Sequence, residues 1–103
     1  MICDNLSSVN GRLFFAGRDT LSLAKEFGTP LYVMDEERIR ANCRAYLTAM
    51  KESFGPSALP LYAGKAASFT ALIRIIKEEG MGLDVVSSGE VATAVKAGFP
   101  MEN

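Results

Sequence analysis

The sequence contains no histidine and only two cysteines. Without histidine, the chain cannot assemble a Ser-His-Asp or Cys-His catalytic site, nor a metal site with histidine ligands. Lysines and carboxylates are the catalytic groups that remain. Cys3 and Cys43 lie 40 residues apart and form no metal-spaced pair. We therefore expect both to be free thiols in a reducing compartment, with no bound metal.

Three further absences narrow the class of protein. No apolar run reaches the length of about 18 residues that a membrane-spanning helix needs. The first residues show no basic segment followed by an apolar one, which a secretory signal would require. Eleven basic and twelve acidic residues are mixed along the chain, with no basic stripe or charged tail. We expect a cytoplasmic protein that binds neither nucleic acid nor membrane.

Composition and length are those of part of a globular protein. Hydrophobic residues make up 49% of the chain and charged residues 22%, which is ordinary for a folded domain. The chain has 103 residues, whereas a complete eight-fold β/α barrel needs about 250. The last residues lead towards what would be a further strand, so we interpret the chain as a fragment.

A short apolar run followed by an amphipathic stretch occurs three times. The runs predict strands over residues 31–35, 59–65 and 82–86. A helix is predicted after each strand. The predicted buried face of the first helix comprises Ile39, Cys43, Leu47, Met50 and Phe54. The corresponding residues are Phe69, Leu72, Ile73 and Ile76 in the second helix, and Val91, Ala94 and Val95 in the third. Alternating strands and helices favour an α/β fold with a parallel sheet, either a closed barrel or an open doubly wound sheet.

Polar residues and glycines mark the expected helix ends. Asp35 and Ser68 are predicted N-caps of the first two helices, and Ser87 with Glu90 has the S-x-x-E spacing of a capping box. Gly80 and Gly98 are predicted to end the second and third helices.

Residues 1–28 lack this repeating order. Residues 12–16 are predicted to form a strand and residues 22–27 a short helix. We therefore expect a division into a leader, 1–28, which could belong to a second domain, and the three strand–helix units, 29–103.

Functional groups in such units gather where strands end, and Lys65 occupies one of these positions. Strand alternation would place Leu61, Ala63 and Lys65 on one side. In a desolvated pocket a lysine can lose its proton near neutral pH and become a nucleophile. The alternative is a solvated lysine that simply finishes a strand.

The acidic residues nearby also admit two interpretations. Asp84 lies inside an apolar run, where a buried carboxylate would need a partner, either the Lys65 amine or a structural arginine. Glu90 is accounted for by the capping box alone. Residues 87–89 additionally offer backbone donors at a helix N-terminus, which is a generic anion site.

Three motifs together resemble one known family. Residues 27–36, FGTPLYVMDE, resemble the start of the barrel in diaminopimelate decarboxylases. Residues 62–66, YAGKA, resemble that family's Y-A-x-K-A segment, whose lysine binds pyridoxal phosphate. Residues 82–90, GLDVVSSGE, are similar to its G-x-D-V-x-S-x-G-E segment, and residues 97–100 continue the likeness. The resemblance covers residues 21–103 in the same order and spacing.

The resemblance implies a fold-type III enzyme dependent on pyridoxal phosphate, with an alanine-racemase-like (β/α)8 barrel and a β domain that packs with the leader strand. Lys65 would bind the cofactor covalently, with Asp84 and Glu90 close to the cofactor pocket. The full-length protein would be a cytoplasmic homodimer that decarboxylates meso-diaminopimelate to L-lysine. The phosphate-binding and substrate-binding residues of the family would lie beyond Asn103, so the fragment alone is expected to be inactive.

Three other functions stay open from the sequence. A related enzyme could decarboxylate ornithine, arginine or carboxynorspermidine instead. A non-catalytic protein that carries pyridoxal phosphate could use the same barrel. In a plain α/β domain, Lys65 would be only a surface charge.

Overall fold

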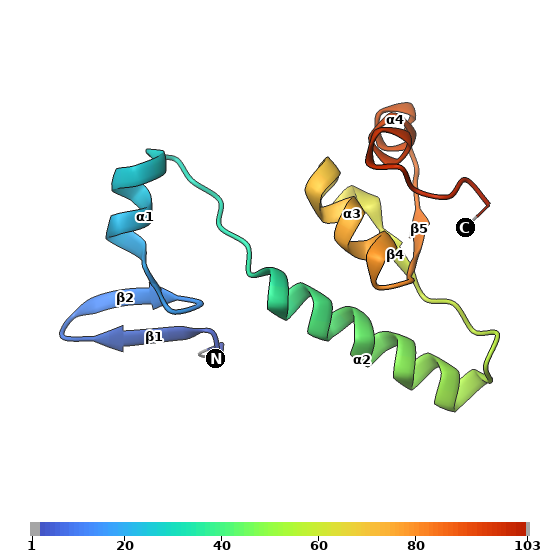
Figure 1. Ribbon diagram of the computed structural model, residues 1–103, viewed down its shortest axis with the longest axis horizontal. Helices are drawn as coiled ribbons and strands as arrows, with labels where there is room; N and C mark the ends of the chain where they lie inside the picture. Colours follow the sequence, from blue (N-terminus) through green and yellow to red (C-terminus); the bar gives the residue numbers. More distant parts are fainter. Residues whose placement is uncertain (1–2, 103) are drawn as a thin grey trace. The chain divides into compact units, whose positions relative to one another are not determined.

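The computed structural model describes residues 3–102 and divides the chain into two compact units, residues 1–35 and 36–103 (Figure 1). Residues 1–2 and 103, which the expected domain limits include, lie outside the described residues. Each unit has its own secondary structure, and each is described by itself.

The first unit contains a three-stranded antiparallel sheet in the order β1-β2-β3. Its strands are β1 (Leu6–Val9), β2 (Arg12–Phe15) and β3 (Arg18–Asp19). Asn10 and Gly11 join β1 to β2, and both have positive φ, 51° and 74°. Asn-Gly favours this conformation, and its twist matches that of the flanking strands, so the pair fixes the hairpin register.

Helix α1 (Thr20–Phe27) follows β3 directly. Asp19 is its N-cap, because the backbone N–H of Leu21 donates to Asp19 Oδ1 at 2.9 Å. Asp19 also forms a 2.5 Å ion pair with Arg12 of β2, which ties the start of the helix to the sheet. The predicted strand and helix of this region are thus confirmed with small shifts in their limits. Strands β1 and β3 were not predicted.

Residues 31–35 form no strand, so that prediction is wrong. Within the described part of the chain this segment joins no ladder of strand hydrogen bonds. Tyr32 is 97% exposed, and Leu31 and Val33 are exposed as well. An apolar run becomes a strand only when another strand pairs with its backbone, and none does here.

The second unit alternates helices and strands. Its elements are α2 (Glu36–Phe54), β4 (Leu61–Ala63), the 3-10 turn η1 (Gly64–Ala66), α3 (Thr70–Glu78), β5 (Gly82–Asp84) and α4 (Ser88–Ala97). Strands β4 and β5 pair in parallel, with Leu61 opposite Gly82 and Ala63 opposite Asp84. The three predicted helices and the parallel pairing are confirmed, and the fold is α/β.

Several predicted limits were wrong. Both strands are shorter than expected, since β4 ends at Ala63 and β5 at Asp84. Ser68 does not cap α3. Phe69 occupies the N-cap position, and no side-chain hydrogen bond caps the helix there. Gly98 ends α4 in the left-handed conformation, as predicted.

The core of the second unit lies where α3 packs against α2 and α4. Ile73 and Ile76 of α3 are almost completely buried, and the other buried members are Cys43, Leu72, Met81, Ala94, Ala97 and Phe99. The predicted faces of α2 and α3 are confirmed except at their ends, where Phe54 and Phe69 are exposed. On α4, Ala94 and Ala97 face the core, whereas Val95 is 58% exposed, so the predicted stripe was wrong there.

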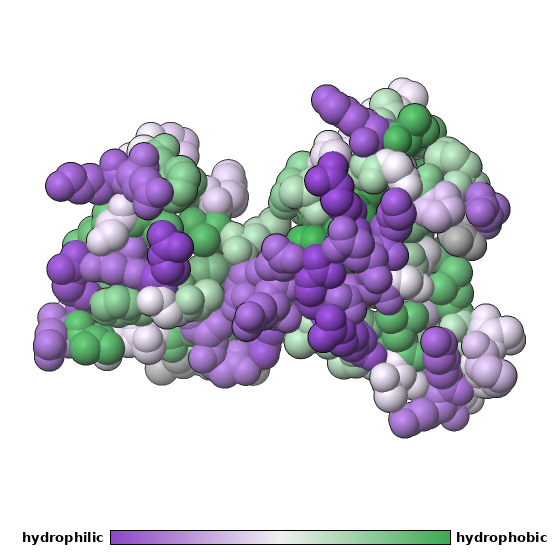
Figure 2. Space-filling view, viewed as in Figure 1, coloured by the Kyte–Doolittle hydropathy of each residue, from purple (hydrophilic) through white to green (hydrophobic). Residues whose placement is uncertain are grey.

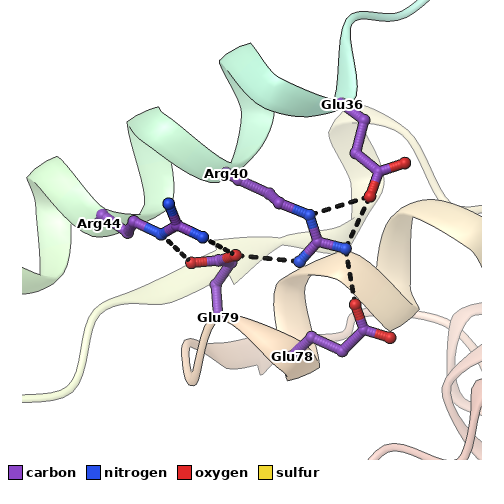
Figure 3. A network of polar contacts seen from close by, with 5 residues as sticks. All are labelled: Glu36, Arg40, Arg44, Glu78 and Glu79. Carbon is purple, nitrogen blue, oxygen red and sulfur yellow. Dashed lines mark hydrogen bonds and ion pairs between the residues drawn. The ribbon is translucent and has the colours of Figure 1, made fainter.

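A cluster of ion pairs joins α2 to the end of α3 (Figure 3). Arg40 contacts Glu36, Glu78 and Glu79 at 2.6–2.9 Å, and Arg44 contacts Glu79 at 2.6 Å. Figure 2 shows hydrophilic side chains gathered over this part of the unit. Because two arginines share Glu79, whose side chain is only 7% exposed, the cluster holds the two helices in one register.

Both cysteines are free, as predicted. Cys3 is exposed and Cys43 is buried in the core. Burial raises the pKa of the Cys43 thiol, and the Glu79 carboxylate adds to this effect. The thiol therefore stays protonated and unreactive at neutral pH. None of the helices among residues 3–102 is long and apolar enough to cross a membrane.

Candidate functional site

Lys65 lies at the centre of the 3-10 turn that follows β4. Its side chain is exposed, and the described residues do not enclose it in a pocket. The predicted alternation of Leu61, Ala63 and Lys65 on one face does not extend to the lysine, because the strand ends at Ala63. A turn rather than a strand thus presents the amine, directly beyond the parallel sheet.

Gly64 brings this turn against β5 and α4. It is buried, and a Cβ atom added there would lie 3.1 Å from Glu90 Oε1 and 3.2 Å from the Asp84 carbonyl oxygen. Backbone approaches this close are those for which glycine is suited. The turn that carries Lys65 therefore sits directly on the carboxylate of Glu90.

Glu90 is buried, with 8% of its surface exposed. Its Oε2 atom accepts hydrogen bonds from the Ser87 hydroxyl at 2.7 Å and from the Val86 backbone N–H at 3.1 Å. The backbone N–H of Glu90 donates to Ser87 Oγ at 3.2 Å, which confirms the predicted capping box. One feature departs from the usual motif, in which the carboxylate binds the N–H of the cap residue itself.

The capping box accounts for only one of the two carboxylate oxygens. Glu90 Oε1 is buried without a hydrogen-bond partner among the described residues. An unpartnered carboxylate oxygen in the interior is costly, and such atoms are rare in folded proteins. The atom lies against the Gly64 backbone of the turn that carries Lys65.

Asp84 ends β5 opposite Ala63. Its side chain is exposed, so the expectation of a buried carboxylate that needs a partner was wrong. Strand β5 is shorter than predicted and ends at Asp84. Asp84 therefore lies at the end of the sheet and not inside it, which explains why its side chain is exposed. No hydrogen bond or ion pair between Asp84 and Lys65 is present in the described residues.

The N-terminus of α4 is less open to anions than the sequence suggested. Glu90 already supplies a carboxylate to the Val86 N–H and the Ser87 hydroxyl. A second anion at residues 87–89 would be repelled by that charge. Asp35, the third expected strand end, lies in the first unit, where it accepts a hydrogen bond from Asn5 Nδ2 at 3.1 Å.

The sequence analysis did not single out Tyr62. Its hydroxyl donates to the carbonyl oxygen of Ala67 at 3.1 Å, across the turn that carries Lys65. Its ring packs against the core of the second unit, and this burial raises the pKa of its hydroxyl. The sequence did offer one indication of this role, because Tyr62 lies in the predicted strand only three residues before the candidate lysine.

Metal ligation finds no support at this site. Residues 3–102 contain no group of three or more histidine, cysteine, aspartate or glutamate side chains placed to hold a metal ion. The arrangement offers instead an exposed primary amine on a turn packed over a buried carboxylate. Such an amine can condense with a carbonyl compound.

Comparison with known proteins gives a consistent result. The family described as "Pyridoxal-dependent decarboxylase, pyridoxal binding domain" matches residues 36–103. The chain is 48% identical over 93 residues to the diaminopimelate decarboxylase of Bacillus subtilis, and 47% identical over 91 residues to that of Bacillus methanolicus. These alignments cover 90% and 88% of this chain but 21% of each relative.

Solved structures agree with the sequence comparison. The crystal structure of the diaminopimelate decarboxylase from Methanocaldococcus jannaschii is similar at a TM-score of 0.83 and 40% identity. It is matched over 94% of this chain and 23% of its own. A second structure of that enzyme, in complex with L-lysine, gives a TM-score of 0.81. The chain thus spans about a fifth of the length of the relatives it matches.

Proposed function

The chain belongs to the family of pyridoxal-dependent decarboxylases, within their pyridoxal-binding domain, and from this membership we propose that it forms part of a diaminopimelate decarboxylase. The reaction is removal of one carboxylate of meso-diaminopimelate as CO2, which yields L-lysine. Identities of 47–48% to relatives that carry this name support the choice of substrate.

The observation that carries the proposal is the position of the Lys65 turn. The turn carries an exposed primary amine, and its Gly64 backbone lies against the buried carboxylate of Glu90, whose Oε1 atom has no partner among the described residues. A surface lysine with no function would not need an unsatisfied acid beneath its backbone. A ligand that bonds to the amine and donates a hydrogen bond to the acid satisfies both groups.

Pyridoxal phosphate is the cofactor of this domain, and the residues present fit it. Lys65 would hold it covalently through its aldehyde, and Glu90 would face it with the free Oε1 atom. Asp84 would lie near the cofactor, at the end of the strand beside the turn. When bound, the cofactor supplies an electron sink for the pair left on the α-carbon as CO2 departs.

The protein's own groups have separate tasks in this proposal. The Lys65 amine would hold the cofactor. The buried Glu90 carboxylate fixes the orientation of what is bound over it. The pairing of β4 with β5 brings the turn of Lys65 close to the first turn of α4, which carries Glu90, because Ala63 and Asp84 are directly paired.

The first experiment is to reduce the full-length protein that contains this chain with borohydride and to map its peptides. We expect a pyridoxyl group on Lys65, and we expect its loss, together with loss of turnover, in Lys65→Ala. Lys51→Ala is the control, since it removes an exposed lysine from α2. A protein without a pyridoxyl group on Lys65, or a fully active Lys65→Ala variant, would refute the proposal.

A panel of substrates distinguishes the remaining functions. Turnover of diaminopimelate, and not of ornithine, arginine or carboxynorspermidine, is the expected result. A pyridoxyl group on Lys65 without any turnover would instead indicate a non-catalytic carrier. Homodimerisation and a cytoplasmic location are also proposed, on the family resemblance, and sedimentation and cell fractionation test them.

A further inference from the structure

Two fixed points hold the ends of the Lys65 turn. At its start, Ala63 is paired with Asp84 in the parallel ladder. At its end, the Ala67 carbonyl accepts the 3.1 Å hydrogen bond from the Tyr62 hydroxyl. Tyr62 lies directly before residues 63–66, and its hydroxyl binds the residue directly after them. Residues 63–66 therefore form a loop that this hydrogen bond closes.

The Tyr62 ring itself has little freedom. It belongs to the partly buried side chains packed against the core that includes Ile73 and Ile76. A side chain held in this way presents its hydroxyl at one place, so the hydrogen bond transmits the rigidity of the core to Ala67. The Tyr62 ring therefore packs against the core, and its hydroxyl restrains the turn through the hydrogen bond to Ala67.

We propose that Tyr62 is a positioning residue for the cofactor-binding lysine, acting through its hydrogen bond to the Ala67 carbonyl. This inference rests on the function proposed above, because it assumes that Lys65 binds pyridoxal phosphate. Tyr62 does not touch the Lys65 amine. It limits the conformations of the turn, so the amine meets its ligand in the orientation that Glu90 beneath the turn requires.

The test is Tyr62→Phe in the full-length protein, which keeps the packed ring and removes only the hydroxyl. Loss of one hydrogen bond that restrains the turn is expected to raise the apparent Kd for pyridoxal phosphate about 2- to 10-fold. The rate of covalent attachment to Lys65, followed by borohydride trapping at intervals, is expected to fall by a similar factor. KM for the substrate is expected to stay unchanged.

Tyr46→Phe is the matched control. Tyr46 is 65% exposed on α2, so the substitution also removes one tyrosine hydroxyl, and we expect the wild-type Kd and attachment rate. The melting temperature of the cofactor-free protein separates a stability effect from a positioning effect. A lower melting temperature with unchanged Kd and attachment rate would overturn the proposal, as would no change in any of these quantities.

Failure of this inference differs from failure of the proposed function. If the wild-type protein forms the Lys65 adduct and Tyr62→Phe forms it equally fast and tightly, only the role of Tyr62 is refuted. If the wild-type protein forms no adduct at Lys65, the function itself is refuted.

Discussion

The two oxygens of the Glu90 carboxylate have different surroundings. Oε2 completes the cap of α4 through the Ser87 hydroxyl and the Val86 N–H, whereas Oε1 has no partner among the described residues. A residue that served only the helix could leave its second oxygen in water. Here that oxygen is buried under Gly64, which is the basis for assigning Glu90 a second task.

Glu90→Gln separates the two tasks. The amide oxygen can still accept the bonds that Oε2 accepts, so the melting temperature is expected to change little. The substitution removes the negative charge of the carboxylate, and we expect kcat/KM to fall about 10-fold or more, as for other groups that orient a reacting centre. Steady-state kinetics and thermal unfolding of the full-length protein measure the two effects.

Ser87→Ala is the control for Glu90→Gln. It removes the cap hydroxyl and is expected to destabilise the protein by about 0.5–2 kcal/mol. Activity below the melting temperature is expected to persist, because the carboxylate remains. Wild-type kinetics in Glu90→Gln would leave Glu90 with its capping role alone.

Local chemistry made part of the site predictable from the sequence. Ser87 and Glu90 are three residues apart, and their capping box depends only on that spacing. The contact of Gly64 with Glu90 joins a 3-10 turn to the first turn of α4 through the pairing of β4 with β5, and no local pattern specifies its geometry. The exposure of Asp84 was missed for the same reason, because it depends on where the ladder ends.

The ion pairs between α2 and α3 act at the scale of whole elements. Hydrogen bonds from Arg44 and Arg40 lower the pKa of Glu79, while burial of its side chain opposes this effect. A carboxyl group with a lowered pKa in the folded state stabilises the fold while it is ionised. The pairs at Glu79 therefore link the packing of these helices to pH.

The pH dependence of stability tests this link with Glu79→Gln. The pKa of Glu79 is lowered from its ordinary value of 4.5, so its contribution is complete at neutral pH. As the pH falls below about 4.5, the unfolded chain takes up a proton at Glu79 more readily than the folded chain, and the contribution is lost. We expect the wild type to melt at a higher temperature than the variant at pH 7, with the gap closing in acid.

Glu52→Gln provides the comparison for this experiment. Glu52 is an exposed glutamate of α2 that takes no part in the ion pairs of the described residues. The melting temperature of Glu52→Gln is expected to equal that of the wild type at every pH. A constant gap between the wild type and Glu79→Gln down to the lowest pH would contradict the assigned contribution.

Helices were easier to predict than strands. The amphipathic period of α2 and α3 and the glycine after each helix depend on neighbouring residues, so their limits were nearly right. Strand limits depend on a partner. Residues 31–35 have the same apolar character as β4, yet only β4 finds a strand to pair with in the described part of the chain.

At the scale of the whole molecule, many large apolar side chains are exposed. Tyr32, Val86 and Leu61 are 97%, 67% and 56% exposed. Large exposed apolar side chains mark places that other protein surface covers, or that aggregate when it is absent. The chain spans 21% of the length of its Bacillus relatives, so those relatives have ample chain to cover the corresponding surface.

We therefore expect the 103-residue chain, expressed alone, to show no decarboxylation of diaminopimelate. We also expect it to self-associate, because no other strand among residues 3–102 pairs with either outer edge of the β4–β5 pair. Size-exclusion chromatography and a coupled assay for released CO2 measure both properties. A monomeric, active chain would contradict this expectation.

The sequence distance between the site's parts has a consequence for biogenesis. Lys65 and Glu90 are separated by only 25 positions, and the two strands whose pairing brings them together both lie within residues 61–84. The entropic cost of closing a loop grows with its length, so these contacts are inexpensive to form. Once the ribosome has released the chain as far as α4, the strand pairing, the Tyr62 hydrogen bond and the Glu90 contact that hold the Lys65 turn can all form.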